Sequence, residues 1–352
     1  MDNASEYYGG AGHYDRETVR FFDVAHEGAQ LRAVGSAAPQ LERLRGMQPR
    51  SLVVVGTDQI ARAAARACVA LHGPLNLPVV VTDSLPAYVG PLDVVLFTGD
   101  AGSREADLRG LLSAAGRGSE TVLAGPARGL LLDDAPAATT VIPALPTSAG
   151  PSPARTLAAV GAVLASLTHD AAVIAEQCDL LADAVDEELA SLSPERDASV
   201  NPARQLREFA EGARVLHSGA GSTGAAVAEL AAHLWSARGI PSGYVHPDEL
   251  ALALEDAGGT AAASRDLFHD PFLDGPRELV PLKTVLWAQR DTAAPNTRAE
   301  TADAVGAVGA ASAASSGETV QALRLVTRAF AATALDGGLD GRLDGGRNGT
   351  AE

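Results

Sequence analysis

The chain has 352 residues and a formal net charge of −17, which results from 27 basic and 44 acidic side chains. Lys283 is its single lysine, and no stripe of basic residues occurs, which disfavours nucleic acids and anionic membranes as partners. Hydrophobic residues make up 46% of the sequence, enough for the cores of two domains of ordinary size.

The sequence also predicts the cellular setting. Cys68 and Cys178 lie in apolar helical stretches and are expected to be buried thiols rather than a disulfide. The N-terminus lacks the basic and apolar segments of a signal peptide, and no run of about 18 apolar residues occurs. We therefore expect a cytoplasmic protein that does not enter the membrane.

In chain order, residues 1–34 are predicted to be an N-terminal arm followed by a short helix at 17–33. Residues 35–150 then show a repeated pattern of strand, turn and helix. "SLVVVGTDQIARAAARACVALHG" predicts a buried strand, a turn at Gly56 and a helix, and "LDVVLFTGDAGSREADLRGLLSAAGRGS" predicts the same order again. Short apolar runs that alternate with helical patterns indicate a parallel sheet covered by helices.

Residues 151–194 are predicted to be a helical linker, and residues 195–335 return to the strand–turn–helix pattern. The Gly- and Asp-rich tail 336–352 is predicted to be disordered. The expected fold class is α/β, with two doubly wound domains that each have a parallel sheet flanked by helices. The linker helices are apolar enough to predict a homodimer interface on them.

The turn "FTGDAG" is the first candidate site. A strand that ends at Phe97, followed by Thr98, Gly99 and a helix from about Ser103, directs several backbone N–H groups at one point. This geometry suits a phosphate or carboxylate, and the two hydroxyl groups add donors. The alternative is an ordinary helix cap made by Asp100 or Ser103.

The turn "GAGSTG" is the second candidate. Gly219, Gly221, Ser222 and Thr223 lie within a G-x-G-x-x-G pattern between a strand and a helix, as in a dinucleotide-binding turn. The acidic residue expected about 20 positions later comes too late, at Asp248. The alternative is a turn whose glycines let the helix pack closely on the strand, and we expect no cofactor.

The stretch "YVHPDE" is the third candidate, with His246 and Glu249 as a possible acid–base pair. The alternative is a structural histidine at the end of a strand. The eight histidines show no metal-ligand spacing, so no metal site is expected.

The duplicated α/β pattern, the "LFTGDAGSREADL" loop and "NPARQLREFAEG" give the chain a family resemblance. Over most of residues 40–335 it resembles the bifunctional phosphoglucose/phosphomannose isomerases, which contain two sugar isomerase (SIS) domains. The resemblance implies a phosphorylated hexose as ligand. It places the family's S-G-N-T phosphate loop at Thr98, Gly99, Asp100 and Ala101, and its first glycine-rich turn at Gly56 and Thr57.

In the same alignment, this chain has other residues at the family's catalytic positions. Ser236 occupies the position of the glutamate that moves the proton between C1 and C2, and the ring-opening histidine falls near Leu252. Neither side chain is an acid–base catalyst at neutral pH, and loss of a positioned base typically removes about 10²–10⁴-fold of rate. His246 and Glu249 are the nearest substitutes. Asp100 would place a negative charge where the phosphate binds.

Three hypotheses follow. The protein is an isomerase of glucose 6-phosphate or mannose 6-phosphate with shifted catalytic residues and weak activity. Alternatively, it is a catalytically silent SIS protein that binds a sugar phosphate or a partner protein. The third hypothesis is a nucleotide-dependent enzyme that uses the GAGSTG loop.

Overall fold

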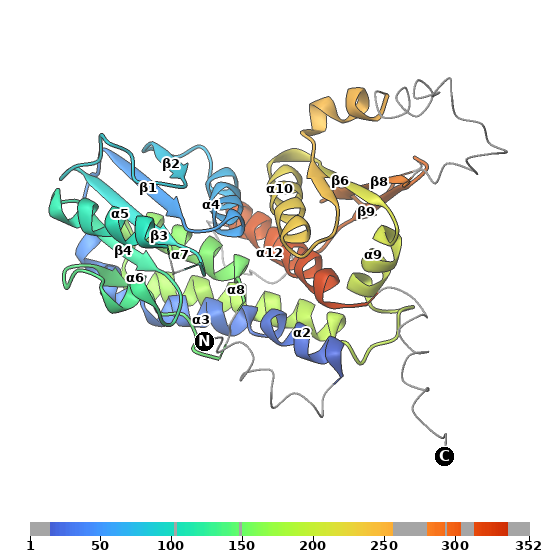
Figure 1. Cartoon of the computed structure of the whole chain (residues 1–352), viewed down its shortest axis with the longest axis horizontal. Helices are drawn as coiled ribbons and strands as arrows, with labels where there is room; N and C mark the ends of the chain where they lie inside the picture. The colour runs from blue at the N-terminus through green and yellow to red at the C-terminus, as the bar shows by residue number, and fades with distance from the viewer. Residues whose placement is uncertain are drawn as a thin grey trace, which may run out of the picture.

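The computed structural model describes residues 15–101, 104–147, 150–255, 280–292, 294–303 and 313–336. Figure 1 shows two α/β units beside one another, with long helices between and beneath them. Of the tail predicted to be disordered, only Asp336 belongs to the described residues, and most of the predicted N-terminal arm lies outside them.

The first sheet has five parallel strands in the order β2-β1-β3-β4-β5. Its strands are β1 Ser51–Gly56, β2 Val79–Thr82, β3 Asp93–Thr98, β4 Glu120–Ala124 and β5 Thr140–Val141. Every residue of β1 and β3 is buried. Alternate side chains of these strands enter two different hydrophobic clusters, as for Leu52 and Val53, because successive side chains of a strand point to opposite faces.

The second sheet has four parallel strands in the order β7-β6-β8-β9. Its strands are β6 Arg214–Gly219, β7 Ser242–Tyr244, β8 Leu282–Trp287 and β9 Thr297–Glu300. The predicted fold class is thereby confirmed: two parallel sheets, each flanked by helices. Strand β9 was not predicted, because its short sequence TRAE contains two charged residues and no apolar run.

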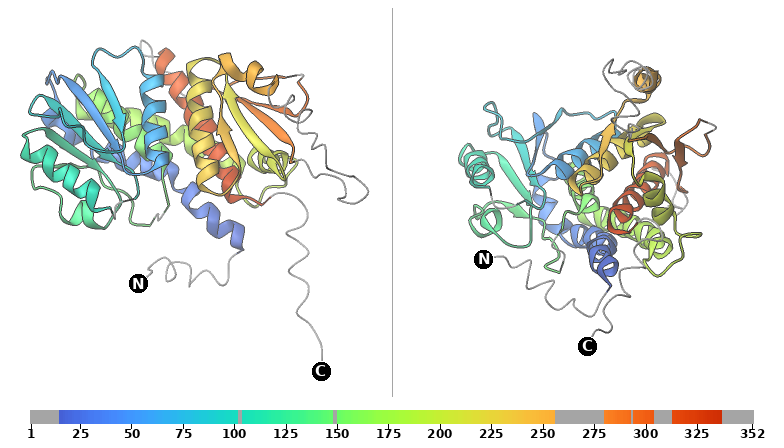
Figure 2. Two further views of the ribbon diagram at one scale, coloured as in Figure 1. Left: turned by 45° about the horizontal axis from the view of Figure 1, so that its top comes forward. Right: turned by 45° about the vertical axis from the view of Figure 1, so that its right-hand side comes forward.

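The helices are arranged around and between the sheets. Their bounds are α2 Arg16–Ala25, α3 Glu27–Ser36, α4 Gln59–Leu71, α5 Glu105–Gly116, α6 Leu130–Asp133, α7 Pro153–Ser166, α8 Ala171–Leu192, α9 Pro202–Ala210, α10 Gly221–Ala237 and α12 Ala313–Ala334, with short 3₁₀ helices η2 Ala38–Leu44 and η3 Pro247–Glu249. Helix α4 follows β1 and helix α10 follows β6, and the two helices lie side by side between the sheets (Figures 1 and 2).

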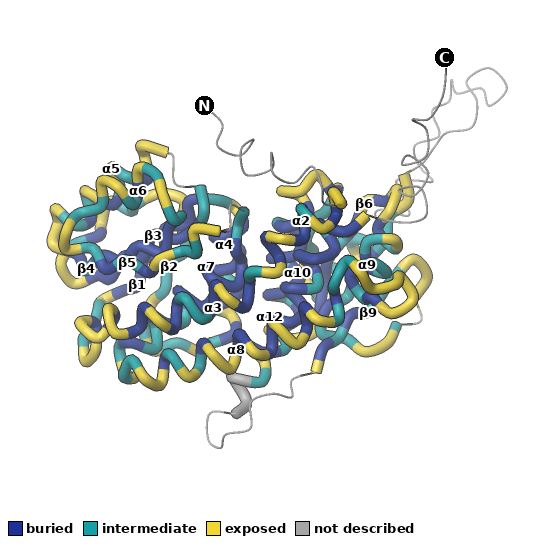
Figure 3. Tube along the Cα trace, turned by 90° about the horizontal axis from the view of Figure 1, so that it is seen from below, coloured by how far each residue is buried: buried dark blue, intermediate teal, exposed yellow. Residues whose placement is uncertain are grey.

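The region 151–194, predicted to be a helical linker, contains α7 and α8. Helix α7 is buried along most of its length, so most of its apolar residues belong to this chain's own core, and α8 packs on α3 and α12 (Figure 3). Val173 and Leu180 of α8 are exposed. One hydrophobic cluster extends from Leu52 in the first sheet to Trp287 in the second. The burial of α7 removes much of the reason for expecting a homodimer interface on the linker, and the homodimer stays a prediction.

Among the described residues, no helix combines the length and the apolar character needed to cross a membrane.

Candidate functional site

Each sheet has a point where the strand order reverses, between β1 and β3 in the first sheet and between β6 and β8 in the second. In open parallel sheets, ligands bind outside the carboxyl ends of the strands at this switch point. The first switch point brings together the turns after β1 and β3, and the Thr57 N–H donates a 2.9 Å hydrogen bond to the Thr98 carbonyl. The "FTGDAG" and "VGTDQ" turns are therefore neighbours at the edge where a ligand is expected.

Gly99 makes this close approach possible. Its φ of 124° is unfavourable for residues with a side chain. A Cβ atom at this position would lie 2.4 Å from Thr57 Oγ1 and 2.7 Å from Asp58 Oδ2. Only glycine lets the two turns touch, so Gly99 has a structural role at the edge of the crevice.

Asp58, which was not among the predicted site residues, binds both turns. Its Oδ1 accepts a 2.8 Å hydrogen bond from the Ala61 N–H and so caps α4. Its Oδ2 accepts a 3.0 Å hydrogen bond from the Asp100 N–H. The Gly99 N–H donates to the Ala124 carbonyl at 3.3 Å. Two of the N–H groups expected to receive an anion are thus already bonded within the chain.

The Asp100 carboxylate points out of its own turn and towards α7. Arg155 Nη2 donates to Asp100 Oδ1 at 2.5 Å, and the Ser152 N–H donates to Asp100 Oδ2 at 3.0 Å. Burial raises the pKa of Asp100, and the Arg155 guanidinium opposes that rise. Asp100 therefore does not cap α5, whose N-cap position is Arg104, and instead accepts the N–H of Ser152, the N-cap residue of α7. Ser103 lies outside the described residues.

Glu27 is a second carboxyl group at the same helix end. Its Oε2 accepts a 2.8 Å hydrogen bond from the Ala154 N–H, and its Oε1 is buried without a hydrogen-bond partner among the described residues. Burial raises the pKa of Glu27 to about 8, an effect that hydrogen bonds from Ser152 and Ala154 oppose. The N-terminus of α7 thus holds two acidic side chains of its own chain rather than a ligand.

The hydroxyl groups of the first switch point differ in their partners. Thr98 Oγ1 donates to Thr156 Oγ1 at 3.4 Å. Thr57 Oγ1 is buried and has no hydrogen-bond partner among the described residues. A buried hydroxyl without a partner is unfavourable, and such groups often face a ligand or a bound water. Thr57 is consequently the predicted residue that retains a free hydrogen-bonding group.

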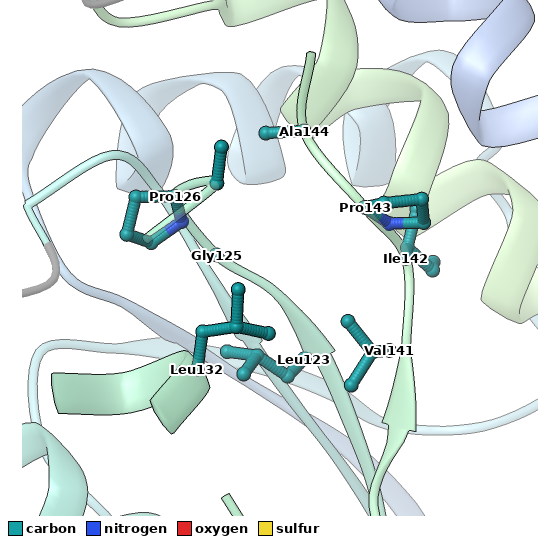
Figure 4. Close-up of a pocket in the computed structure, with 9 residues that line it drawn as sticks. Leu123, Gly125, Pro126, Leu132, Val141, Ile142, Pro143 and Ala144 are labelled. Carbon is teal, nitrogen blue, oxygen red and sulfur yellow. The ribbon is translucent and has the colours of Figure 1, made fainter. Parts of the chain in front are cut away.

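Two pockets lie near the carboxyl ends of the first sheet. One, of about 270 Å³, is bordered by Asp83 and Ser84 after β2 and by Arg104 and Asp107 near the start of α5. Arg104 and Asp107 form an ion pair with a 2.8 Å Nε–Oδ2 distance, so this pocket suits neutral hydroxyl groups better than phosphate. The other, of about 60 Å³, is mostly apolar and too small for a hexose phosphate (Figure 4).

The second switch point contains the GAGSTG turn. A Cβ atom at Gly219 would lie 2.4 Å from the Gly224 carbonyl oxygen, so these glycines let α10 pack against β6. Gly221 has a φ of 63° and open space around it. Ser222 is exposed and Thr223 is buried. The packing requirement explains Gly219 and Gly224, as the alternative reading of this turn proposed.

His217 on β6 is part of an aromatic core. Its Nδ1 accepts a 3.1 Å hydrogen bond from Trp287 Nε1, and its ring meets the Trp235 ring edge to face at a centroid distance of 4.7 Å. Burial lowers the pKa of His217 to about 3, so the ring is neutral. This histidine is buried in the core of the second half and does not face solvent.

The predicted acid–base pair lies on the surface. His246 and Glu249 follow β7 and are both exposed, and the Asp248 N–H donates to His246 Nδ1 at 3.4 Å. Ser236 is also exposed and donates to the Ser242 carbonyl at 3.0 Å. Leu252 is 62% exposed. None of these four side chains lines either of the pockets near the first sheet.

A polar cluster that the sequence did not predict lies where α4 and α10 meet. Arg66 Nε and Glu229 Oε1 form an ion pair at 2.6 Å, and Gln59 Nε2 donates to the His233 carbonyl at 3.4 Å. Arg62 Nη1 donates to the Gly56 carbonyl at 2.9 Å, so this guanidinium lies at the carboxyl end of β1. The spacing of Arg62 and Arg66, and of Glu229 and His233, was the available signal, because residues four apart share a helix face.

The sequence matches no protein-family model and no curated protein, but solved structures share the fold. The C-terminal domain of glucosamine-fructose-6-phosphate aminotransferase from Francisella tularensis superposes with a TM-score of 0.52 at 13% identity, covering 93% of this chain and 99% of that chain. Tagatose-6-phosphate ketose/aldose isomerase from Escherichia coli gives a TM-score of 0.53 at 12% identity, covering 88% and 91%. The chain therefore shares the fold of these two structures, with two parallel sheets each flanked by helices.

Proposed function

We propose that this chain binds a phosphorylated sugar at the first switch point and isomerises it slowly or not at all. The structural neighbours named above act on phosphorylated sugars according to their names, which supports this ligand class. The switch point between β1 and β3 is where the topology favours ligand binding. Glucose 6-phosphate and mannose 6-phosphate, which the sequence resemblance implies, are the finer candidates.

The orientation of Asp100 is the observation that carries the proposal. From the sequence, its charge would repel a phosphate by about 4 kcal/mol at 4 Å and an effective dielectric of 20. In the structure this carboxylate faces Arg155 and the Ser152 N–H instead. The reason for expecting a blocked anion site at this turn is thereby removed, while Thr57 still offers an unpartnered hydroxyl.

Asp58 limits the affinity that we expect. Because its carboxylate already accepts the Asp100 N–H, a bound phosphate must either displace it or use other donors. The Thr57 hydroxyl and the Arg62 guanidinium, which bonds the Gly56 carbonyl, are two donors at this edge. We therefore propose a phosphate that contacts side chains more than backbone N–H groups.

The proposed lack of efficient catalysis rests on the residues at the aligned catalytic positions and on their nearest substitutes. Ser236 and Leu252 cannot move protons, and His246 and Glu249 are exposed in the second half. A general base must lie within hydrogen-bond reach of the proton that it removes. We accordingly propose a silent or slow isomerase over an efficient one.

Thermal-shift and calorimetric titrations with glucose 6-phosphate, mannose 6-phosphate and fructose 6-phosphate test this function. A ligand at 100 times its dissociation constant stabilises the fold by about 2.7 kcal/mol, which is readily measured. We expect at least one of these ligands to stabilise the protein and a coupled isomerase assay to give little product. Turnover of about 10 per second, an ordinary enzymatic rate, would refute the silent reading.

The nucleotide-dependent alternative receives less support. Gly219 and Gly224 are required for the packing of α10, which leaves less of the GAGSTG pattern to be explained by a ligand. NAD and NADP belong in the same titrations. Saturable binding of either that is abolished by Gly221→Ala would favour this alternative, because Gly221 has open space around it.

A further inference from the structure

The contact between α4 and α10 pairs Arg66 with Glu229 and brings Gln59 to the His233 carbonyl. Arg62 and Arg66 are one helical turn apart on α4, and Glu229 and His233 are one turn apart on α10. Gln59 reaches the His233 carbonyl, whereas Arg66, two turns later, reaches Glu229. The two helices therefore run antiparallel at this contact, and the end of α10 lies at the start of α4.

The positive charges of this contact are unequally compensated. The 2.6 Å ion pair matches Arg66 with Glu229. Among the described residues, Arg62 forms no ion pair, and its recorded partner is the neutral Gly56 carbonyl. A guanidinium has five N–H donors, so this single bond leaves Arg62 with donors to spare. Arg62 is thus a partly buried cation at the carboxyl end of β1 with unused hydrogen-bonding capacity.

His233 belongs to the other half of the molecule, and its carbonyl accepts the hydrogen bond from Gln59, three residues before Arg62. It is half-buried, and burial lowers its pKa; the Arg66 and Arg62 guanidinium groups lower it further, and Glu229 opposes them. These three charged groups, two on α4 and one on α10, act on the imidazole. Burial raises the pKa of the Tyr244 phenol on β7, and the charges of Glu229 and Glu249 add to this rise. The His233 imidazole is therefore neutral without a ligand. A bound anion beside it would favour the imidazolium form.

We propose that Arg62 and His233 together bind the phosphate group of the ligand, so that the site is shared between the two halves of the chain. This inference rests on the proposed phosphosugar function and adds a residue that the second half contributes. Arg62 supplies a permanent charge-assisted hydrogen bond. His233 takes up a proton from the solvent when the phosphate binds, because the anion offsets the guanidinium charges that disfavour the imidazolium ion.

A shared site has a structural consequence. A phosphate held by Arg62 on α4 and His233 on α10 connects the two helices that lie side by side between the sheets, so binding stabilises the contact between these helices. The ion pair between Arg66 and Glu229 keeps the helices aligned before the ligand arrives. This arrangement differs from a site at a single turn, which would leave α10 unaffected.

Isothermal titration calorimetry with fructose 6-phosphate as the probe tests the inference. Titrations at one pH in buffers of different ionisation enthalpy measure the protons taken up on binding. We expect wild type to take up more protons on binding than His233→Gln does. Protons gained or lost by the ligand itself are the same in both titrations, so they do not contribute to this difference. We expect Arg62→Gln to bind about tenfold to a hundredfold more weakly, the range for a hydrogen bond to a charged group.

His169→Gln is the matched control, because His169 is an exposed histidine beyond the end of α7. It should bind with wild-type affinity and wild-type proton uptake. If His233→Gln fails to fold, His233→Asn serves as a second test. Circular dichroism verifies that each variant is folded.

The outcomes separate the two proposals. If wild type binds none of the sugar phosphates, the proposed function and this inference both fail. If wild type binds, but Arg62→Gln retains its affinity and His233→Gln its proton uptake, the function stands and the shared site is wrong.

Discussion

The two switch points have the same topology and different chemistry. In the first, Asp58, Asp100 and Arg155 connect the turns to the linker helix through charged hydrogen bonds. In the second, Gly219 and Gly224 touch directly, and a neutral His217 is enclosed by tryptophan rings. The comparison shows that strand order determines where a ligand can bind, whereas the side chains determine whether anything there can hold it.

The difference also concerns how each half is stabilised. Buried charges are costly unless they are paired, so the first switch point depends on each partner being present. The second depends on shape, because Gly219 and Gly224 leave no room for a side chain. Substitutions at equivalent positions should therefore lower stability for different reasons in the two halves: loss of a charge partner in the first and steric overlap in the second.

The largest expected effect is that of Arg155→Met. The Arg155 side chain is fully buried and bonds both Asp100 and the Gly125 carbonyl. Its loss leaves the Asp100 carboxyl without its cation, and breaking a buried pair costs about 3–5 kcal/mol. Urea denaturation measures this loss. Arg109→Met, at an exposed ion pair with Glu105, is the control and should change stability by less than about 1 kcal/mol. Equal effects of the two substitutions would contradict the proposed role of the charged cluster.

The next largest effects are those of two glycine substitutions in the second half, which distinguish tight packing from backbone strain. Gly219→Ala places a Cβ atom 2.4 Å from a backbone oxygen and should destabilise the fold by about 2–4 kcal/mol. Gly221→Ala meets only the penalty of its φ of 63°, about 1–2 kcal/mol. The free energies of unfolding of the two variants test this order. A larger loss for Gly221→Ala would mean that packing does not explain the GAGSTG turn.

The pH dependence of stability should have opposite signs in the two halves. The pKa of Glu27 is raised to about 8 from 4.5, so the folded state binds the extra proton, and this stabilisation is lost as the pH rises from about 4.5 to 8. The pKa of His217 is lowered from 6.5 to about 3, so the unfolded state binds the extra proton, and stability is lost as the pH falls from about 6.5 to 3. Each slope approaches 1.4 kcal/mol per pH unit at most.

The variants Glu27→Gln and His217→Gln test these slopes one at a time. Glu27→Gln should remove the loss of stability between about pH 6.5 and 8, and His217→Gln should remove the loss below about pH 4.5. Between about pH 4.5 and 6.5 the two slopes oppose each other in the wild type, so each variant should expose the slope of the remaining group there. Chemical denaturation at several pH values provides the measurement. A wild-type stability that is flat between pH 5 and 8, with no change of slope in Glu27→Gln, would contradict the burial of a titrating Glu27.

The smallest effect concerns Asp100→Asn. From the sequence alone, this change should improve phosphate binding, because it removes a negative charge from the turn. The structure predicts no such gain, because Arg155 already neutralises that charge. We expect affinity for fructose 6-phosphate within about twofold of wild type, together with a measurable loss of stability. Clearly tighter binding would show that Asp100 faces the ligand after all.

The fold was predictable because its signals are local. Apolar runs such as Leu52–Val55 and the glycine turns that follow them identify buried strands and their helices without reference to the rest of the chain. Strand β9 lacked an apolar run, and the single helix predicted at 17–33 is two helices, α2 and α3. The local pattern contains little to indicate either feature.

The site was only partly predictable because its decisive contacts are distant in sequence. Thr57, Thr98, Gly99 and Asp100 were predicted from their turns, and the structure places the two turns next to each other, while the binding role of these residues stays a prediction. That Asp100 faces Arg155, 55 residues later, depends on how the linker helix packs. His233 lies 174 residues from the glutamine that contacts its carbonyl. The pairing of α4 with α10 cannot be derived from either helix alone.

Thr57→Val tests the central claim, a phosphosugar site at the first switch point, most directly. The Thr57 hydroxyl is buried without a partner, so its replacement by a methyl group should leave the free energy of unfolding unchanged or raise it slightly. Calorimetric titration with fructose 6-phosphate should at the same time show about tenfold weaker binding, because the ligand loses a donor. Wild-type affinity in a stable Thr57→Val protein would contradict a site at this turn.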